Sequence, residues 1–245
     1  MDMKNFLTIF VLLVTAAFAQ AKTLVVYYSY TNNVHRIVTE LCSQIEADVM
    51  RVEPAEKGLD YAANNYAIGS AQIAAIREKP DDASSYPAID PVNVDLSQYS
   101  TIIVGAPLWW SNMAAPLQTF LFQHGKEMAG KNIGLIVSSA SSGISGVEGD
   151  AKRLIPDGNF LTPSLWIRSS QTSNAATLIS DWLKVIGYDS LAGIESVAND
   201  YVTDRTMVIY NLSGLRVANP ENLPKGIYIV RYTDGNIIQT KKIML

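Results

Sequence analysis

The sequence has few of the residues that usually carry covalent or metal chemistry. Its 245 residues include one cysteine, Cys42, and two histidines, His35 and His124. A single cysteine excludes an internal disulfide, and we expect Cys42 to be a small buried apolar residue. His35 has no second ligand at the four-residue spacing of a helical metal pair. We therefore predict no metal site, and a surface position for His35.

Basic stripes and enzyme signatures are also missing. The net charge is −4, and no cluster of lysine and arginine matches a nucleic-acid backbone. The glycines at Gly143, Gly146 and Gly149 do not have the spacing of a nicotinamide-binding fingerprint. No Ser-His-acid combination occurs in a G-x-S-x-G context. We therefore predict no nucleic-acid partner and no catalytic side chain.

Long apolar runs are confined to the first residues. Lys4 precedes the apolar stretch Phe6–Phe18, which is too short to span a bilayer, and Ala17-Phe18-Ala19 forms an A-x-A cleavage site. This pattern predicts a signal peptide over residues 1–19, cut before Gln20 or, alternatively, after Ala21. We expect an exported protein, periplasmic or at the cell surface or secreted, without a membrane span.

The remaining sequence is rich in alternating strand and helix patterns. Apolar, β-branched runs predict five strands: Leu24–Tyr28, Asp48–Val52, Thr101–Ala106, Lys131–Val137 and Leu161–Ile167. Helical spacing of apolar residues begins at Val34 after the first strand and recurs in four later segments: Tyr61–Arg77, Leu117–His124, Val147–Ile155 and Asn174–Ile186. The alternation predicts an α/β fold with a doubly wound parallel sheet and right-handed crossovers.

The pattern changes near residue 187. We predict an α/β domain over residues 22–187, a linker over 188–200 and a small β module over 201–245. In this module, turn residues separate four short strand patterns: Thr206–Tyr210, Arg216–Ala218, Gly226–Tyr232 and Ile237–Ile243. Short strands separated by Gly, Pro and Asn turns indicate an antiparallel sheet.

A polar segment follows the first predicted strand. It consists of Ser29, Thr31, Asn32 and Asn33, and the helix pattern begins at Val34. Open α/β sheets bind ligands at the carboxyl ends of their strands, and the amino end of a helix favours an anion. The segment therefore predicts an anion site. The alternative is that Asn32 or Asn33 simply caps the helix.

Two more unusual segments follow the third and fourth strands. The third strand leads into Pro107, Leu108, Trp109 and Trp110, and the fourth into Ser138, Ser139, Ala140, Ser141, Ser142 and Gly143. An anion cradle, an aromatic wall and a loop of backbone and hydroxyl donors together suit a planar ring that bears a phosphate. The alternative for the tryptophans is that one belongs to the core and the other acts as a lid.

These three motifs, S-Y-T-N-N-V, P-L-W-W and S-S-A-S-S-G, resemble the flavodoxin family, and more closely its exported members from Bacteroidetes. The resemblance covers residues 22–187 and implies sheet order 2-1-3-4-5 with FMN at the switch point. It implies that residues 29 and 31–34 bind the phosphate. It also implies that Trp109 or Trp110 stacks on the flavin ring, and that residues 138–143 contact the ring's polar edge.

The resemblance predicts an FMN-binding redox protein that transfers electrons outside the cytoplasm. The alternatives are a flavin-dependent quinone or NAD(P)H reductase, and a binding protein that has lost the cofactor. The third motif lacks the family's histidine, and Val34 replaces a threonine, which motivates the last alternative. We also expect a redox partner protein or a small electron acceptor.

Two further features bear on partner proteins and on cellular location. Residues 53–95 contain eight acids and three bases, which indicates either a solvated face or a docking surface for a basic partner. The C-terminal segments Tyr210–Gly214, Leu223–Val230 and Lys241–Leu245 resemble the sorting modules of secreted Bacteroidetes proteins.

Overall fold

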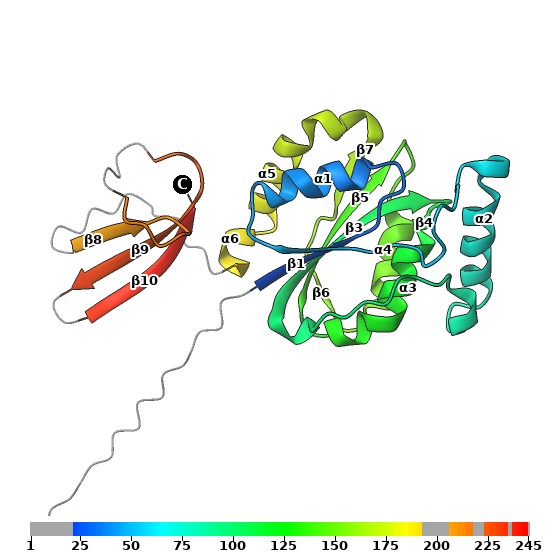
Figure 1. The fold of residues 1–245 in the computed structure, drawn as a ribbon, viewed down its shortest axis with the longest axis horizontal. Helices are drawn as coiled ribbons and strands as arrows, with labels where there is room; N and C mark the ends of the chain where they lie inside the picture. Colours follow the sequence, from blue (N-terminus) through cyan, green and yellow to red (C-terminus); the bar gives the residue numbers. More distant parts are fainter. Residues whose placement is uncertain (1–21, 193–205, 218–222, 235–236, 245) are drawn as a thin grey trace, which may run out of the picture.

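The computed structural model describes residues 22–192, 206–217, 223–234 and 237–244. The predicted signal peptide, residues 1–19, and residues 193–200 of the predicted linker lie outside this part. The described residues form an α/β unit, residues 22–192, and a C-terminal sheet (Figure 1).

The α/β unit is built on a parallel sheet. Its strands are β1 (Lys22–Tyr27), β2 (Asp48–Arg51), β3 (Tyr99–Trp109), β5 (Asn132–Ser139), β6 (Asn159–Phe160) and β7 (Leu165–Arg168). The order is β2-β1-β3-β5, and both β6 and β7 pair with β5. The two-residue strand β4 (Asn112–Met113) pairs antiparallel with β3. Apart from β4, this is the predicted order 2-1-3-4-5.

The predicted fifth strand, Leu161–Ile167, is wrong in its first half. The structure has two short strands there, because β6 ends at Phe160 and β7 begins at Leu165. Leu161 still donates its N–H to the Ile133 carbonyl at 2.8 Å. Pro163 then lies in the gap, and a proline has no N–H to donate to a ladder.

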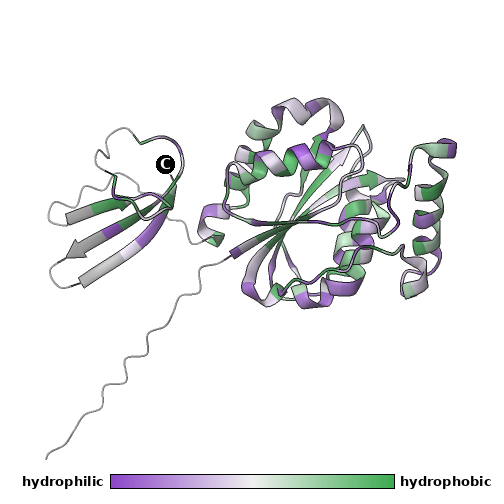
Figure 2. Ribbon diagram, in the orientation of Figure 1, coloured by the Kyte–Doolittle hydropathy of each residue, from purple (hydrophilic) through white to green (hydrophobic). Residues whose placement is uncertain are grey.

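Helices cover both faces of this sheet. They are α1 (Asn33–Cys42), α2 (Ala63–Glu78), α3 (Ala115–His124), α4 (Ser145–Leu154), α5 (Ala175–Val185) and α6 (Tyr188–Leu191). Short 3-10 helices are η1 (Ala83–Ser85), η2 (Leu96–Gln98), η3 (Gly125–Met128) and η4 (Ser169–Asn174). Figure 2 shows the strands between these helices as predominantly hydrophobic.

Alternation along β1 separates two cores. Leu24 and Val26 pack with buried side chains of α2, α3 and α4, whereas Val25 packs with those of α1 and α5. Successive strand residues face opposite sides of a sheet, so one apolar run serves both layers. Cys42 is half-buried against the second core, rather than fully buried as predicted, and burial raises the pKa of its thiol.

The α/β unit extends past its predicted end. The linker was predicted to begin at residue 188, but Tyr188 opens α6, is buried, and shares a 2.8 Å hydrogen bond with the Thr23 hydroxyl. Ala192 is buried as well. The linker prediction is therefore wrong for these first residues, because the chain still has core positions to fill after α5.

The C-terminal sheet is antiparallel, as predicted. It consists of β8 (Thr206–Tyr210), β9 (Ile227–Asp234) and β10 (Ile237–Met244) in the order β10-β9-β8. The predicted strand Arg216–Ala218 is reduced to a single bridge between Arg216 and Tyr210, and Ala218 lies outside the described residues. Lys242 Nζ lies 2.8 Å from Glu46 Oε2 of the α/β unit.

The described residues contain neither a membrane-spanning helix nor a cluster of metal ligands. Among the helices in the described ranges, none is long and apolar enough to cross a membrane. Within the same ranges, no three His, Cys, Asp or Glu side chains are grouped so that they could hold a metal ion. His35 is exposed, as predicted.

Candidate functional site

The three predicted loops lie at one edge of the sheet. Strands β1, β3 and β5 are neighbours and run parallel, so their carboxyl ends meet. Tyr28 donates its N–H to the Gly105 carbonyl at 3.2 Å, and Pro107 pairs with Ser138. We call these segments loop one (Ser29–Val34), the tryptophan turn (Trp109–Asn112) and loop three (Ser138–Gly143).

Loop one is fixed by its buried serine. Ser29 is 2% exposed, and its Oγ accepts a hydrogen bond from the His35 N–H at 3.2 Å. Asn32 occupies the N-cap position of α1 with a φ of 63°, yet its side chain makes no capping bond. Asn32 therefore does not cap the helix with its side chain, as the alternative predicted, because the acceptor for the His35 N–H is the Ser29 hydroxyl.

Loop one presents free backbone donors. Within the described part of the chain, the N–H groups of Thr31, Asn32, Asn33 and Val34 have no hydrogen-bond partner. Thr31 and Asn32 are exposed, whereas the Val34 side chain is buried in the second core. Unpaired N–H groups at the positive end of a helix dipole are suited to an anion. Val34 can contribute its backbone only.

A basic side chain that the sequence analysis missed lies beside loop one. Arg51 pairs with Tyr27 in the register of β1 and β2, and its Nη2 donates to the Ser29 carbonyl at 3.0 Å. Its Nε lies 2.6 Å from a Glu53 carboxylate oxygen. His35 Nδ1 lies 2.7 Å from the Tyr27 hydroxyl. The only sequence signal for Arg51 is its position at the carboxyl end of a neighbouring strand.

The tryptophan turn is a tight hairpin rather than an open loop. Strand β3 was predicted to end at Ala106, but it continues to Trp109, which pairs with Asn112 of β4. Trp110 and Ser111 form the tip, with φ values of 45° and 65°. A two-residue turn with two positive φ values usually requires glycine or asparagine. Neither residue type is present, so contacts from outside the turn must hold it.

The two tryptophans have different environments. Trp109 is half-buried, and its ring centroid lies 5.6 Å from that of Tyr28 and 4.8 Å from that of Tyr61. Trp110 is 41% exposed. The first half of the alternative, in which one tryptophan packs against the core and the other acts as a lid, therefore holds for Trp109, and the lid stays a prediction. Burial raises the pKa of both tyrosines, so their hydroxyls stay neutral.

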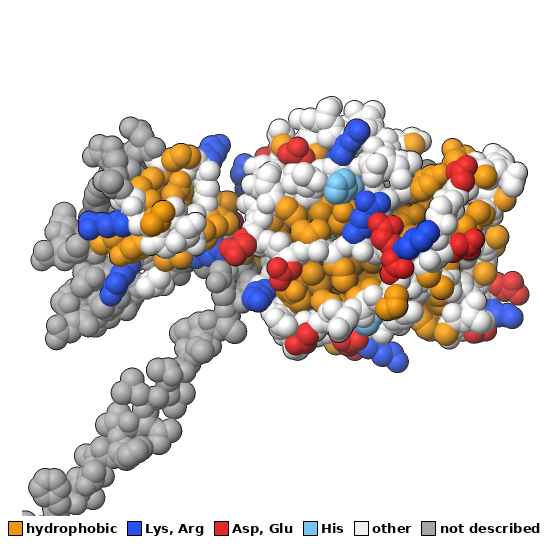
Figure 3. Space-filling view, in the orientation of Figure 1, with side chains coloured by type: hydrophobic (Ala, Val, Ile, Leu, Met, Phe, Trp, Pro, Cys, Tyr) orange, Lys and Arg blue, Asp and Glu red, His pale blue; other side chains and the backbone are white. Residues whose placement is uncertain are grey.

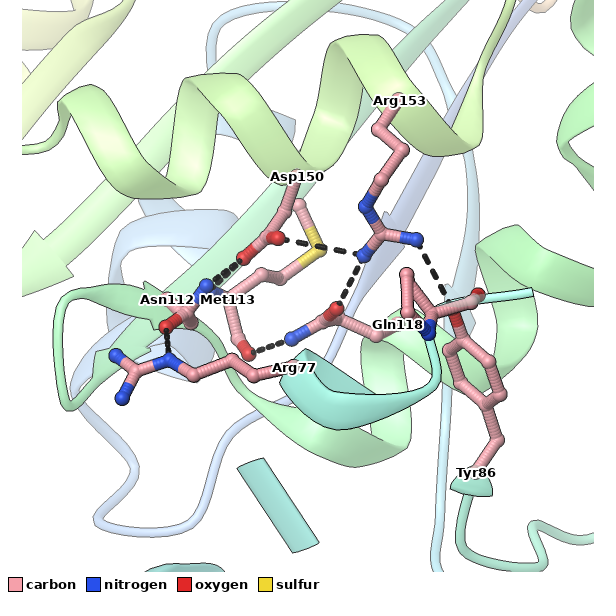
Figure 4. Close-up of polar contacts among 8 residues, drawn as sticks. Arg77, Tyr86, Asn112, Met113, Gln118, Asp150 and Arg153 are labelled. Carbon is pink, nitrogen blue, oxygen red and sulfur yellow. Dashed lines mark hydrogen bonds and ion pairs between the residues drawn. The ribbon is translucent and has the colours of Figure 1, made fainter. Parts of the chain in front are cut away.

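A polar network holds the strand that follows the turn (Figure 4). Asp150 of α4 is buried, and its Oδ2 accepts from the Met113 N–H and the Asn112 Nδ2, both at 2.9 Å. Arg153 lies 3.3 Å from Asp150 Oδ1 and donates to the Gln118 Oε1 at 3.0 Å. The sequence analysis missed Asp150, although it occupies an apolar-face position of its helix pattern.

Loop three is only partly available to a ligand. Ser138 and Ser139 are the last residues of β5 and are buried. The Ser139 Oγ accepts from Trp166 Nε1 at 2.8 Å and donates to the Ser142 carbonyl at 2.9 Å. Its hydroxyl is therefore satisfied within the protein. Residues 140–143 are exposed and lie at the same edge as loop one.

Most acids of residues 53–95 have local partners. Asp82 and Asp95 each accept a hydrogen bond from the backbone N–H two residues later, and a hydrogen bond from Tyr30 lowers the pKa of Asp60. Lys57 Nζ lies 2.5 Å from Asp90 Oδ2. Figure 3 shows acidic and basic side chains interspersed on one face of the α/β unit. The docking surface for a basic partner stays a prediction.

Comparison with known proteins identifies relatives of the α/β unit. The sequence profile of one family, described as flavodoxin, matches residues 22–186. Two structures assigned as flavoproteins, from Bacteroides eggerthii and Bacteroides uniformis, are each 24% identical, with TM-scores of 0.55 and 0.51. They cover 68% and 65% of this chain, and 98% of their own.

A third structure, a Lactobacillus acidophilus flavoprotein in complex with FMN, is 22% identical with a TM-score of 0.50. It covers 64% of this chain and 99% of its own. At these identities the likeness concerns the fold. No curated protein matches the chain.

Proposed function

This chain belongs to the flavodoxin family, and on that premise we propose that it binds FMN and transfers electrons. The observation that carries the proposal is the row of unpartnered backbone N–H groups at residues 31–34, at the carboxyl edge of the sheet. These donors fit the terminal phosphate of FMN, because they supply hydrogen bonds at the positive end of the α1 dipole. The Ser29 hydroxyl holds that end of α1 in place.

The opposite part of the site suits the flavin ring. We propose that Trp110 is the stacking residue, because its ring is the more exposed of the two, whereas Tyr28 and Tyr61 already pack against Trp109. The exposed backbone of residues 140–143 lies at the same edge and offers donors to the polar side of a planar ring. Bound FMN would supply one- and two-electron redox chemistry.

The chain's own residues set the environment of the cofactor. Arg51 brings a guanidinium beside loop one, but its Nε is paired with Glu53 and its Nη2 with the Ser29 carbonyl. The phosphate would therefore be held mainly by uncharged backbone donors. Trp110 and residues 140–143 would shield the ring from water on one side and leave the rest open to an electron donor or acceptor.

The test is a titration of the protein, from Gln20 onward, with FMN and with riboflavin, which lacks the phosphate. We expect saturable quenching of flavin and tryptophan fluorescence by FMN, and binding of riboflavin that is at least about tenfold weaker, since charge-assisted hydrogen bonds to the phosphate are lost. Trp110→Phe should reduce the quenching more than Trp109→Phe. Absence of saturable FMN binding would contradict the proposal and favour the alternative that the fold has lost its cofactor.

We also propose that this redox protein works outside the cytoplasm, with a partner protein or a small electron acceptor. The support is the A-x-A pattern of residues 1–19 and the resemblance of the C-terminal segments to sorting modules. Cell fractionation and mass spectrometry of the mature N-terminus test this cellular location. An intact Met1 in a cytoplasmic fraction would contradict it.

A further inference from the structure

Helix α2 contacts both the ring and the backbone of Trp110. A Cβ at Gly69 would lie 3.0 Å from Trp110 Cζ3, so any larger residue would require the ring to shift slightly. Two turns further along α2, the Arg77 Nη2 donates to the Trp110 carbonyl. The Arg77 Nε donates to the Asn112 Oδ1 at 2.7 Å. One guanidinium therefore binds both sides of the tip.

Helix α4 contacts the same turn from another side. A Cβ at Gly146 would lie 1.8 Å from the Ser111 carbonyl oxygen, so this helix also approaches through a glycine. One turn later, Asp150 Oδ2 accepts from the Met113 N–H and from the Asn112 Nδ2, each at 2.9 Å. The two helices thus reach the turn with the same pair of devices, a glycine and a charged side chain.

The Asn112 side chain joins the two contacts (Figure 4). Its carbonyl oxygen accepts from Arg77 and its amide nitrogen donates to Asp150, so both ends of the amide are used. We propose that Arg77, Asn112 and Asp150 form a positioning chain that holds Trp110 against the flavin ring. This inference rests on the proposed function.

The turn needs such a chain because its own residues do not favour it. Left-handed backbone costs a residue with a side chain about 1–2 kcal/mol, and Trp110 and Ser111 both adopt it. Hydrogen bonds to the Trp110 carbonyl and from the Met113 N–H hold peptide groups on both sides of the tip, and the Asn112 side chain links their partners Arg77 and Asp150. Without them the tip can relax to other turn types, and the ring would lose its fixed orientation.

The first arm of the experiment uses the protein without flavin. The accessibility of Trp110 is measured by acrylamide quenching, with Trp110→Phe subtracted to isolate its signal. Arg77→Met should raise that accessibility, whereas Lys79→Met, which removes a nearby positive charge from the end of the same helix, should not. Arg77→Lys should restore it only in part, because one ammonium cannot replace two nitrogens of a planar guanidinium. Unchanged Trp110 accessibility in Arg77→Met would overturn the proposal.

The second arm measures FMN affinity in a double-mutant cycle. Arg77→Met should weaken binding about fivefold to tenfold, since it removes two hydrogen bonds from a charged donor. In a Trp110→Ala background the same change should have no further effect. Equal losses in both backgrounds would overturn the proposal, because Arg77 would then act independently of Trp110.

Asn112→Leu keeps both charges and removes the central amide. We expect it to produce part of the effect of Arg77→Met in both arms, because the Arg77 bond to the Trp110 carbonyl remains. A wild-type result in either arm would contradict the positioning chain. Thermal unfolding of each variant separates loss of position from loss of folding. If wild-type protein binds no FMN, the proposed function fails. The acrylamide arm still decides whether the positioning chain holds Trp110.

Discussion

Loop one and the tryptophan turn lie at the same edge of the sheet, but they are held in different ways. In loop one, backbone N–H groups without a partner are the proposed donors to the ligand, and a single serine hydroxyl secures the start of α1. In the tryptophan turn, a strained backbone is held by side chains from α2 and α4. We therefore expect the exposed Thr31 of loop one to tolerate most substitutions, and the turn to depend on particular distant residues.

The largest expected effect tests the close approach of α4. Gly146→Ala should lower the free energy of unfolding by about 3 kcal/mol, because the new methyl group would overlap the Ser111 carbonyl and displace the turn. The measurement is urea-induced unfolding.

Gly149→Ala is the matched control on the same helix. A Cβ at Gly149 meets nothing within 4 Å, and alanine favours a helix, so stability should rise by about 0.5–1 kcal/mol. Equal behaviour of the two variants would contradict the role given to Gly146.

The second effect concerns the buried tyrosines Tyr28 and Tyr61, whose rings pack against Trp109. Burial raises the pKa of Tyr28 and Tyr61 above the usual value of 10.0. Their stabilising contribution is therefore complete below pH 10 and falls as the pH rises further, by about 1.4 kcal/mol per pH unit for each tyrosine that stays neutral while folded. Alkaline titration followed by tyrosinate absorbance and circular dichroism checks this. Tyr28→Phe should reduce the loss, and early ionisation without unfolding would contradict burial.

A smaller effect is expected in loop one. Ser29→Ala should lower the free energy of unfolding by about 1 kcal/mol, because the His35 N–H loses its acceptor. It should also weaken FMN binding, since the amino end of α1 would fray. The control is Ser43→Ala at the other end of α1, whose hydroxyl bonds the Glu40 carbonyl and should not affect flavin affinity. Equal flavin affinities for both variants would show that Ser29 has no role in flavin binding.

The smallest effect refines the account of strain in the turn. Ser111→Gly should raise stability by about 0.5 kcal/mol, because glycine adopts the left-handed conformation without steric cost but loses more entropy on folding. Ser142→Gly in loop three, where φ is not positive, should lower stability instead. Differential scanning calorimetry measures both changes, and a destabilised Ser111→Gly variant would argue against strain at the tip.

Local patterns in the sequence were sufficient to predict the sheet and the edge where the loops meet. The buried runs of β1, β3 and β5 and the polar residues after them depend on neighbours along the chain. They therefore predicted a parallel sheet and the positions of loop one and loop three, whereas the order of the strands was implied by the resemblance to the flavodoxin family. Even there, the predicted fifth strand ran through Pro163, which has no N–H for a ladder and lies between β6 and β7.

The supports of the tryptophan turn could not be predicted in the same way. Arg77, Asn112 and Asp150 are 35 and 38 residues apart in sequence, and no short pattern links them. Arg51 lies beside loop one only because of the register of β2 against β1. Such contacts depend on tertiary packing, which a single sequence does not display.

The most direct test of the central claim is a nuclear magnetic resonance titration of ¹⁵N-labelled protein with FMN and, separately, with riboflavin. We predict that FMN shifts the backbone amides of residues 31–34 and the indole N–H of Trp110, whereas riboflavin shifts the indole but leaves those amides near their free positions. Saturable shifts at other sites only, or no saturable shifts with FMN, would contradict the assignment of this edge as the cofactor site.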